Sequence, residues 1–168
     1  MHISNLKIRH ATPVDVPLIL EFVRALAEYE RLSHKVTATE ELLRQSLFES
    51  KSPAEVLIGE LDNEPVGFAV FFHNYSTFLA RPGIYLEDLF VKPVARRKGV
   101  GRALLAYLAR LASDRSCGRL EWSVLDWNQP AIEFYRSLGA VPQDEWTTFR
   151  LTGEALERFA NQGEPNAF

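Results

Sequence analysis

A basic turn containing two glycines separates a predicted strand from a predicted helix, and it limits the possible folds more than any other feature. The segment RRKGVGR, residues 96–102, follows the apolar run IYLEDLFV and precedes the amphipathic run ALLAYLARLA. The first amides of a helix lack intrahelical partners, and the helix dipole favours negative charge there. The glycines leave room for a ligand beside the backbone. The turn therefore predicts an anion site, and a pyrophosphate is the anion that fits it best.

Two common phosphate-binding motifs do not fit this turn. A Walker loop requires Lys and then Ser or Thr after its last glycine, whereas Arg102 and Ala103 follow Gly101 here. A dinucleotide fingerprint requires a third small residue at position 104, which is Leu104, although Glu121 stands at a suitable distance for a ribose contact. The alternative without a ligand is a tight turn followed by a solvated basic helix end.

Length and composition are those of a single soluble domain. The chain has 168 residues, 46% of them hydrophobic and 24% charged. The net charge of −3 argues against a nucleic-acid-binding face. A single cysteine, Cys117, the lack of a signal-peptide pattern and the lack of an apolar run long enough for a membrane span predict a cytoplasmic protein. We expect one domain over residues 1–168, with a frayed tail at about 162–168.

Periodicity and turn signals predict a single-domain α/β fold in which helices flank a mixed, mostly antiparallel central sheet. The strand–helix–strand unit at 84–124 should form a parallel crossover. The predicted strands cover 5–11, a hairpin at 54–75, 83–91, 119–125 and 146–151. The predicted helices cover 11–32, 37–48, 99–115, 128–139 and 153–161, with Thr12, Thr37 or Thr39, and Asn128 as helix caps.

Several segments together resemble those of a known family. The pattern Arg96-x-x-Gly99-x-Gly101 after YLEDLFV resembles motif A of the GCN5-related N-acetyltransferases, and LDWNQPAIEFYRSLGA is similar to their motif B. Within this superfamily the chain most resembles the diamine (spermidine/spermine-type) acetyltransferases and their thialysine-acetylating relatives. The resemblance extends over most of the chain. The stretch 47–66 departs most and is shorter, and it borders the acceptor side in that family.

The resemblance implies that acetyl-CoA is the co-substrate and which residues bind it. The backbone of the strand at 89–91 would run beside the pantetheine arm, and the glycine turn would hold the diphosphate. The implied donor-binding residues are Leu89, Phe90, Val91, Arg96, Arg97, Lys98, Gly99, Val100, Gly101, Arg102, Asn128, Pro130, Ala131 and Tyr135.

Acetyl transfer to an amine requires a deprotonated nucleophile and a proton for the departing thiolate. Glu87 and Asp88 are adjacent acids in an apolar strand, and burying a carboxylate is costly enough to suggest a function, although an edge strand with one acid in water is the alternative. The resemblance implies that both bind the cationic amine, with Glu87 as the base, acting through a water. It also implies that Tyr135 is the general acid, whereas its spacing alone favours an aromatic packing residue.

The remaining acceptor residues implied by the resemblance are Tyr29, Glu30 and Trp146, for which helix-end polarity and core packing are the alternatives. The four histidines show no metal-ligand spacing, so no metal is predicted. The expected function is direct acetyl transfer from acetyl-CoA to a primary amine of a polyamine, a diamine or a thialysine-like amino acid. The alternatives are a non-catalytic acyl-CoA-binding module and a protein or peptide N-acetyltransferase. The resemblance also suggests a homodimer.

Overall fold

The computed structural model describes residues 5–49 and 51–162, and it divides the chain into two compact units, 1–125 and 126–168. The larger unit contains a five-stranded sheet with the strand order β1-β2-β3-β4-β5. The first three strand pairs are antiparallel and the pair of β4 and β5 is parallel, which confirms the predicted mixed sheet and its crossover.

The helices and strands lie close to their predicted places. The strands are β1 (Leu6–His10), β2 (Glu55–Leu61), β3 (Glu64–Ser76), β4 (Arg81–Val91) and β5 (Leu120–Trp122). The helices of the larger unit are α1 (Val16–Tyr29), α2 (Glu40–Phe48) and α3 (Val100–Asp114), and those of the smaller unit are α4 (Gln129–Ser137) and α5 (Gly153–Ala160). Three short 3-10 turns stand at Pro13–Asp15, Ser33–Lys35 and Pro93–Ala95.

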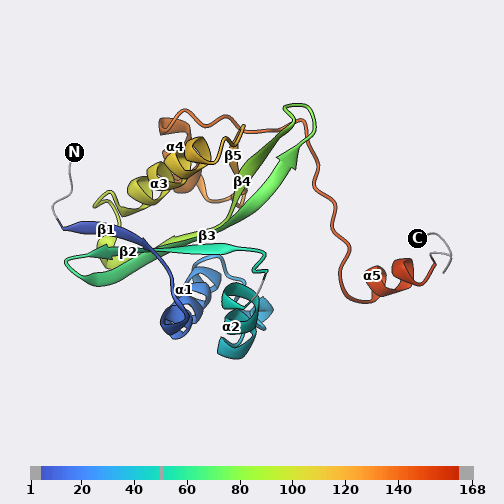
Figure 1. Ribbon diagram of the computed structural model, residues 1–168, viewed down its shortest axis with the longest axis horizontal. Coiled ribbons are helices and arrows are strands. Elements are labelled where there is room, and N and C mark those ends of the chain that lie inside the picture. Colours follow the sequence, from blue (N-terminus) through green and yellow to red (C-terminus); the bar gives the residue numbers. More distant parts are fainter. Residues whose placement is uncertain (1–4, 50, 163–168) are drawn as a thin grey trace. The chain divides into compact units, whose positions relative to one another are not determined.

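Two helical layers cover the sheet of the larger unit: α1 and α2 lie on one face and α3 lies on the other (Figure 1). Phe22 of α1 packs against Phe68 and Phe90 of the sheet, with ring centroids 5.3 and 5.9 Å apart. On the opposite face α3 approaches β2 closely, because a Cβ on Gly59 would stand 3.3 Å from Val100 Cγ1. These contacts hold the start of α3 against the middle of the sheet.

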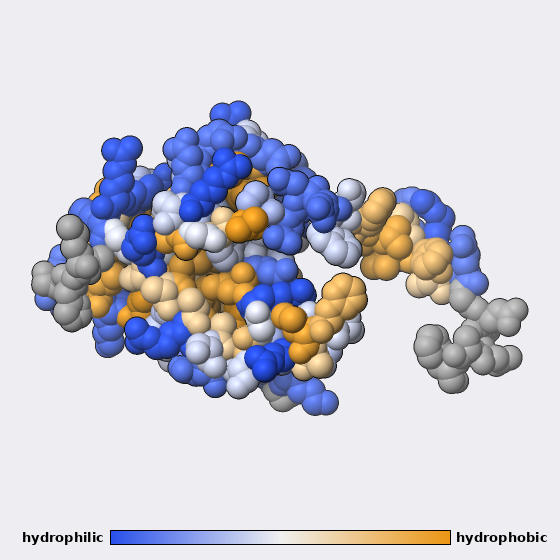
Figure 2. Space-filling model, turned by 90° about the horizontal axis from the view of Figure 1, so that it is seen from above, coloured by the Kyte–Doolittle hydropathy of each residue, from blue (hydrophilic) through white to orange (hydrophobic). Residues whose placement is uncertain are grey.

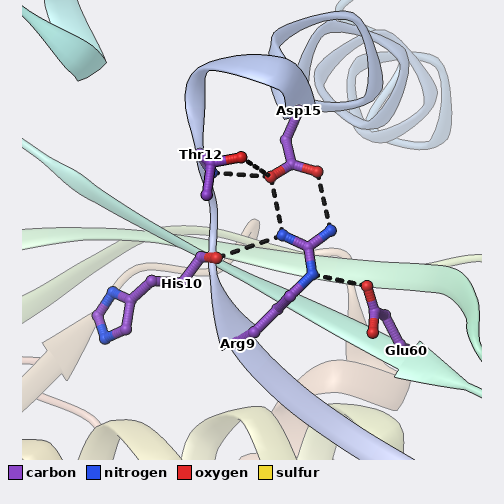
Figure 3. A network of polar contacts seen from close by, with 5 residues as sticks. All are labelled: Arg9, His10, Thr12, Asp15 and Glu60. Atoms are coloured by element: carbon purple, nitrogen blue, oxygen red, sulfur yellow. Dashed lines mark hydrogen bonds and ion pairs between the residues drawn. The ribbon is translucent and has the colours of Figure 1, made fainter.

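A polar network fixes the entry into α1 (Figure 3). Arg9 of β1 donates two hydrogen bonds of 2.8 Å to Asp15 and one of 2.6 Å to Glu60 of β2. Asp15 also accepts from the amide of Thr12, as expected for the acid of a capping box. The Arg9 guanidinium lowers the pKa of Asp15 to about 2. The network thus ties β1, β2 and the start of α1 together.

One predicted strand is wrong. Residues 146–151 form no strand, and among the described residues of the smaller unit there is no other strand with which they could pair. A strand requires a hydrogen-bonded neighbour, whatever its β propensity. Trp146 and Phe149 are 75% and 92% exposed. Of the predicted frayed tail, residues 163–168 lie outside the described residues.

Candidate active site

The glycine turn has the geometry that an anion site requires. Gly99 is the N-cap of α3 and adopts a left-handed conformation with φ of 81°, which a residue with a Cβ enters only at a cost. The helix begins at Val100, so its first amides are those next to the turn. A Cβ on Gly101 would meet only Val91 Cγ2, at 3.8 Å, which leaves this face of the helix end open. Arg97, Lys98 and Arg102 are exposed around it.

Beside the turn, β4 has an unpaired edge. β5 pairs with β4 only from Ile84 to Leu86, so the edge of residues 87–91 that faces away from β3 has no strand neighbour in the described part of the chain. The Lys92 amide donates to Val66 of β3, so alternation along the strand turns the backbone groups of Val91 and Leu89 to the open side. Those amides fit the expected contacts to an extended, amide-containing arm.

Glu87 occupies an irregular position in β4. The pairing with β3 runs from Val70 opposite Asp88 directly to Phe71 opposite Leu86, which leaves Glu87 as the extra residue of a bulge. Bulges re-aim side chains, and they are frequent next to active sites. Glu87 is exposed, whereas Asp88 is partly buried. The alternating periodicity of the sequence gave no signal for this bulge.

Three carboxylates interact at this point of the larger unit. Burial, together with the negative charges of Glu87 and Glu30, raises the pKa of Asp88 to about 6. Burial also raises the pKa of Glu30, which caps the end of α1. Two of the predicted acceptor residues, Glu30 and Glu87, therefore act on the charge of the third, Asp88, although 57 positions separate Glu30 from Glu87 in sequence. Such a group favours a cation as its ligand.

Tyr29 is the last residue of α1 and precedes Glu30 in sequence. Its ring also contacts a residue of the basic turn. The guanidinium carbon of Arg96 stands 4.7 Å from the centroid of the Tyr29 ring and 5.9 Å from that of Phe90. Arg96 Nε also donates a 3.0 Å hydrogen bond to the carbonyl of Val91. The Arg96 side chain thus contacts the end of α1. The sequence pattern did not reveal this contact, which joins residues 67 positions apart.

The smaller unit carries the other predicted site residues. Asn128 is the N-cap of α4, and its side chain accepts a hydrogen bond from the Ala131 amide. Pro130 lies in the first turn of this helix and Tyr135 in its last turn, where the Tyr135 ring packs against Phe134 with centroids 5.5 Å apart. Trp146 is exposed in the irregular segment that follows. The cap is confirmed, and the roles of these residues toward a ligand stay predictions.

Two further features concern ligands and membranes. Over residues 5–49 and 51–162, no three His, Cys, Asp or Glu side chains gather in a way that could hold a metal ion. Within the same ranges, every helix is too short or too polar to cross a bilayer.

The larger unit thus combines an open, basic helix entrance with an unpaired strand edge and a group of three carboxylates. Residues 20–140 match the model of the acetyltransferase (GNAT) family. The chain belongs to this family, whose co-substrate is acetyl-CoA, and it is an acetyltransferase. The expectation drawn from motifs A and B is confirmed.

Named relatives are similar over nearly the whole chain. A thialysine N-epsilon-acetyltransferase from Bos taurus is 38% identical, with 92% of this chain and 97% of the relative covered. An L-ornithine N5-acetyltransferase from Arabidopsis thaliana is 35% identical, with 90% and 86% covered. Among solved structures, an integron cassette protein from V. cholerae superimposes with a TM-score of 0.78 at 28% identity, with 93% of this chain and 98% of that chain covered.

Proposed function

We propose that this acetyltransferase moves the acetyl group of acetyl-CoA to a primary amine of a small cationic acceptor, either a thialysine-like amino acid or a diamine or polyamine. The observation that carries the proposal is the group formed by Glu30, Glu87 and Asp88, whose negative charge a protonated amine would neutralise. The relatives named for thialysine and ornithine support an amino acid with a side-chain amine as the first candidate.

The donor fits the glycine turn and the open edge of β4. The diphosphate would accept from the first amides of α3, with Arg97, Lys98 and Arg102 supplying positive charge. The amides of Leu89 and Val91 would bond the arm and the thioester oxygen, and the donor supplies an activated acetyl group. Asn128, Pro130 and Ala131 are also proposed to contact the donor. The fit rests on the left-handed Gly99 and on the unpaired strand edge.

In the proposed transfer, the amine nitrogen forms a bond to the acetyl carbon and the carbon–sulfur bond breaks. The ammonium first gives one proton through a water to Glu87, which frees the nitrogen lone pair for attack. The second proton, which becomes acidic once the nitrogen has attacked, leaves through solvent and replaces the proton that the general acid gives up. Asp88, Glu30, Tyr29 and the indole face of Trp146 are proposed to hold the cationic acceptor. The departing thiolate takes a proton from Tyr135. The acid–base residues argue against a non-catalytic acyl-CoA-binding module, and a peptide acceptor is the other alternative to test.

A panel of amines tests this proposal. The protein is incubated with acetyl-CoA and, separately, with thialysine, ornithine, lysine, putrescine, spermidine and a lysine-containing peptide, and both CoA release and acetylated amine are measured. We expect the highest kcat/KM with a small dication or a thialysine-like amino acid. Preference for the peptide would favour a protein acetyltransferase, and CoA binding without turnover on any amine would favour the non-catalytic module.

We further propose that residues 1–168 form one acetyltransferase domain that acts in the cytoplasm as a homodimer and binds no nucleic acid. Support for self-association comes from the smaller unit, where Val141, Phe149 and Phe159 are 75%, 92% and 65% exposed. Hydrophobic residues are visible along the α5 segment (Figure 2). Large exposed apolar surfaces commonly mark interfaces. Light scattering after size-exclusion chromatography should give twice the 19.1 kDa chain mass, and a monomer would contradict the proposal.

A further inference from the structure

Arg96 contacts both sides of the substrate site in the larger unit. It stands at the end of the 3-10 turn Pro93–Ala95, three residues before Gly99, so its backbone belongs to the donor turn. Its side chain leaves that turn and lies over the ring of Tyr29, next in sequence to Glu30. A single side chain thus joins the donor turn to the helix end that carries an acceptor carboxylate.

Two more contacts fix the direction of this side chain. Arg96 Nε donates to the carbonyl of Val91, on the open edge of β4, at 3.0 Å. The guanidinium also lies 5.9 Å from the ring centroid of Phe90, which is 5% exposed and packs on Phe22 of α1. Because Phe90 stands two positions after Asp88 in the strand, both side chains lie on the face of β4 that α1 covers. Arg96 therefore bridges α1, β4 and the turn.

Arginine is suited to such a bridge for a chemical reason. Its planar guanidinium can stack on an aromatic ring while its N–H groups donate in the plane, and a lysine ammonium cannot do both in this geometry. The charge of Arg96 lies over the ring of Tyr29. Arg97, Lys98 and Arg102 are the other exposed basic residues of the turn that an anion could reach. The motif arginine thus has a second partner in this chain besides any phosphate.

We propose that Arg96 is a positioning residue that couples donor binding to acceptor binding. A bound donor fixes the conformation of the turn, and Arg96 then fixes the positions of Tyr29 and Glu30 for binding of the amine. A bound amine fixes the conformation of the turn through the same contact. This inference rests on the proposed function. The coupling is reciprocal because of thermodynamic linkage. If a bound amine raises the affinity for the donor by some factor, a bound donor must raise the affinity for the amine by the same factor.

Isothermal titration tests the coupling without turnover, with CoA as the donor probe and the preferred amine of the panel as the second ligand. In the unaltered protein, saturating amine should lower the Kd of CoA by a factor on the order of ten. In Arg96→Ala the factor should fall toward one. Arg96→Lys should recover CoA affinity, because it keeps the positive charge, and its coupling factor should stay near one. If the role of Arg96 were purely electrostatic, the lysine variant would recover the coupling as well.

Two control variants distinguish the contact between Arg96 and the Tyr29 ring from a general effect of positive charge and from an effect of the Tyr29 hydroxyl. Lys98→Ala removes a charge from the same turn, so it should weaken CoA binding and leave the coupling factor unchanged. Tyr29→Phe keeps the aromatic ring and should keep the coupling, whereas Tyr29→Ala should abolish it, with no further loss in the double variant with Arg96→Ala.

The outcomes distinguish this inference from the proposed function. Turnover of the amine with a coupling factor that Arg96→Ala leaves unchanged would overturn the role of Arg96 alone, as would a factor of one in the unaltered protein. Absence of turnover with every amine would instead contradict the proposed function.

Discussion

The carboxylate of Asp88 should destabilise the folded protein at neutral pH. Its pKa rises from 3.8 to about 6 because the group is partly buried near Glu87 and Glu30. A folded-state pKa above the unfolded one means that the native chain holds this proton more tightly. Stability is therefore lost as the pH rises from about 4 to about 6, and the full cost is present above that range. The substitution that tests this is Asp88→Asn.

The size of the effect follows from the pKa shift. A rise of about 2 pKa units, at about 1.4 kcal/mol per unit, corresponds to about 3 kcal/mol as the largest gain for Asp88→Asn near pH 7.5. Near pH 4.5 the native carboxyl is mostly protonated, so the gain should fall to about 1 kcal/mol. A gain of this size is large beside the typical total stability of about 5–15 kcal/mol.

Urea unfolding at the two pH values measures the difference directly. Glu64→Gln is the control, because Glu64 is an exposed acid at the β2–β3 turn, and it should change the free energy of unfolding by less than about 0.5 kcal/mol at either pH. Asp88→Asn should also raise the KM for the amine, since the substitution removes a counter-charge.

Two results would refute this reasoning. One is a variant that is less stable than the parent near pH 7.5. The other is a stability gain that is equal at both pH values, because the cost of ionising Asp88 would then not be its source.

Other substitutions test separate parts of the account. Gly99→Val should weaken CoA binding, measured by titration, and should lower stability by about 1–2 kcal/mol because φ is 81° there; unchanged affinity would contradict a diphosphate site at the turn. Tyr135→Phe should slow turnover and leave the CoA Kd nearly intact, and an unchanged rate with chemistry rate-limiting would remove Tyr135 as the acid. Glu87→Gln should reduce kcat/KM most at low pH, where more of the amine is protonated, and a pH–rate profile like the parent's would remove the base assignment. Asp15→Asn should cost about 2 kcal/mol near pH 7, because the pKa of Asp15 is lowered to about 2; that stabilisation is lost as the pH falls from about 4 to about 2, so a parent and variant that differ equally at pH 2 and 7 would contradict it.

Local signals in the sequence were sufficient for most of the fold. Thr39 and Asn128 cap their helices through side-chain hydrogen bonds, as their positions before apolar periodic segments indicated. Alternating and continuous apolar runs gave the hairpin and the central strand. The prediction of a strand at 146–151 was wrong, because a strand must pair with a neighbouring strand and local β propensity does not specify that neighbour.

The candidate site was predictable from the sequence where a motif or two adjacent residues define it. Gly99, Gly101 and the acid pair were found in this way. The bulge at Glu87 depends on the register between two strands, and the contact of Arg96 with Tyr29 depends on how α1 lies on the sheet. Neither leaves a periodic trace in one sequence, since each is decided by tertiary packing.

The most direct test of the central claim is a crystal structure of the protein with acetyl-CoA. The account predicts the diphosphate at the first amides of α3, next to Gly99, and the pantetheine arm along the open edge of β4 at Leu89 and Val91. A donor whose diphosphate lies elsewhere, with the α3 entrance closed by side chains, would contradict it.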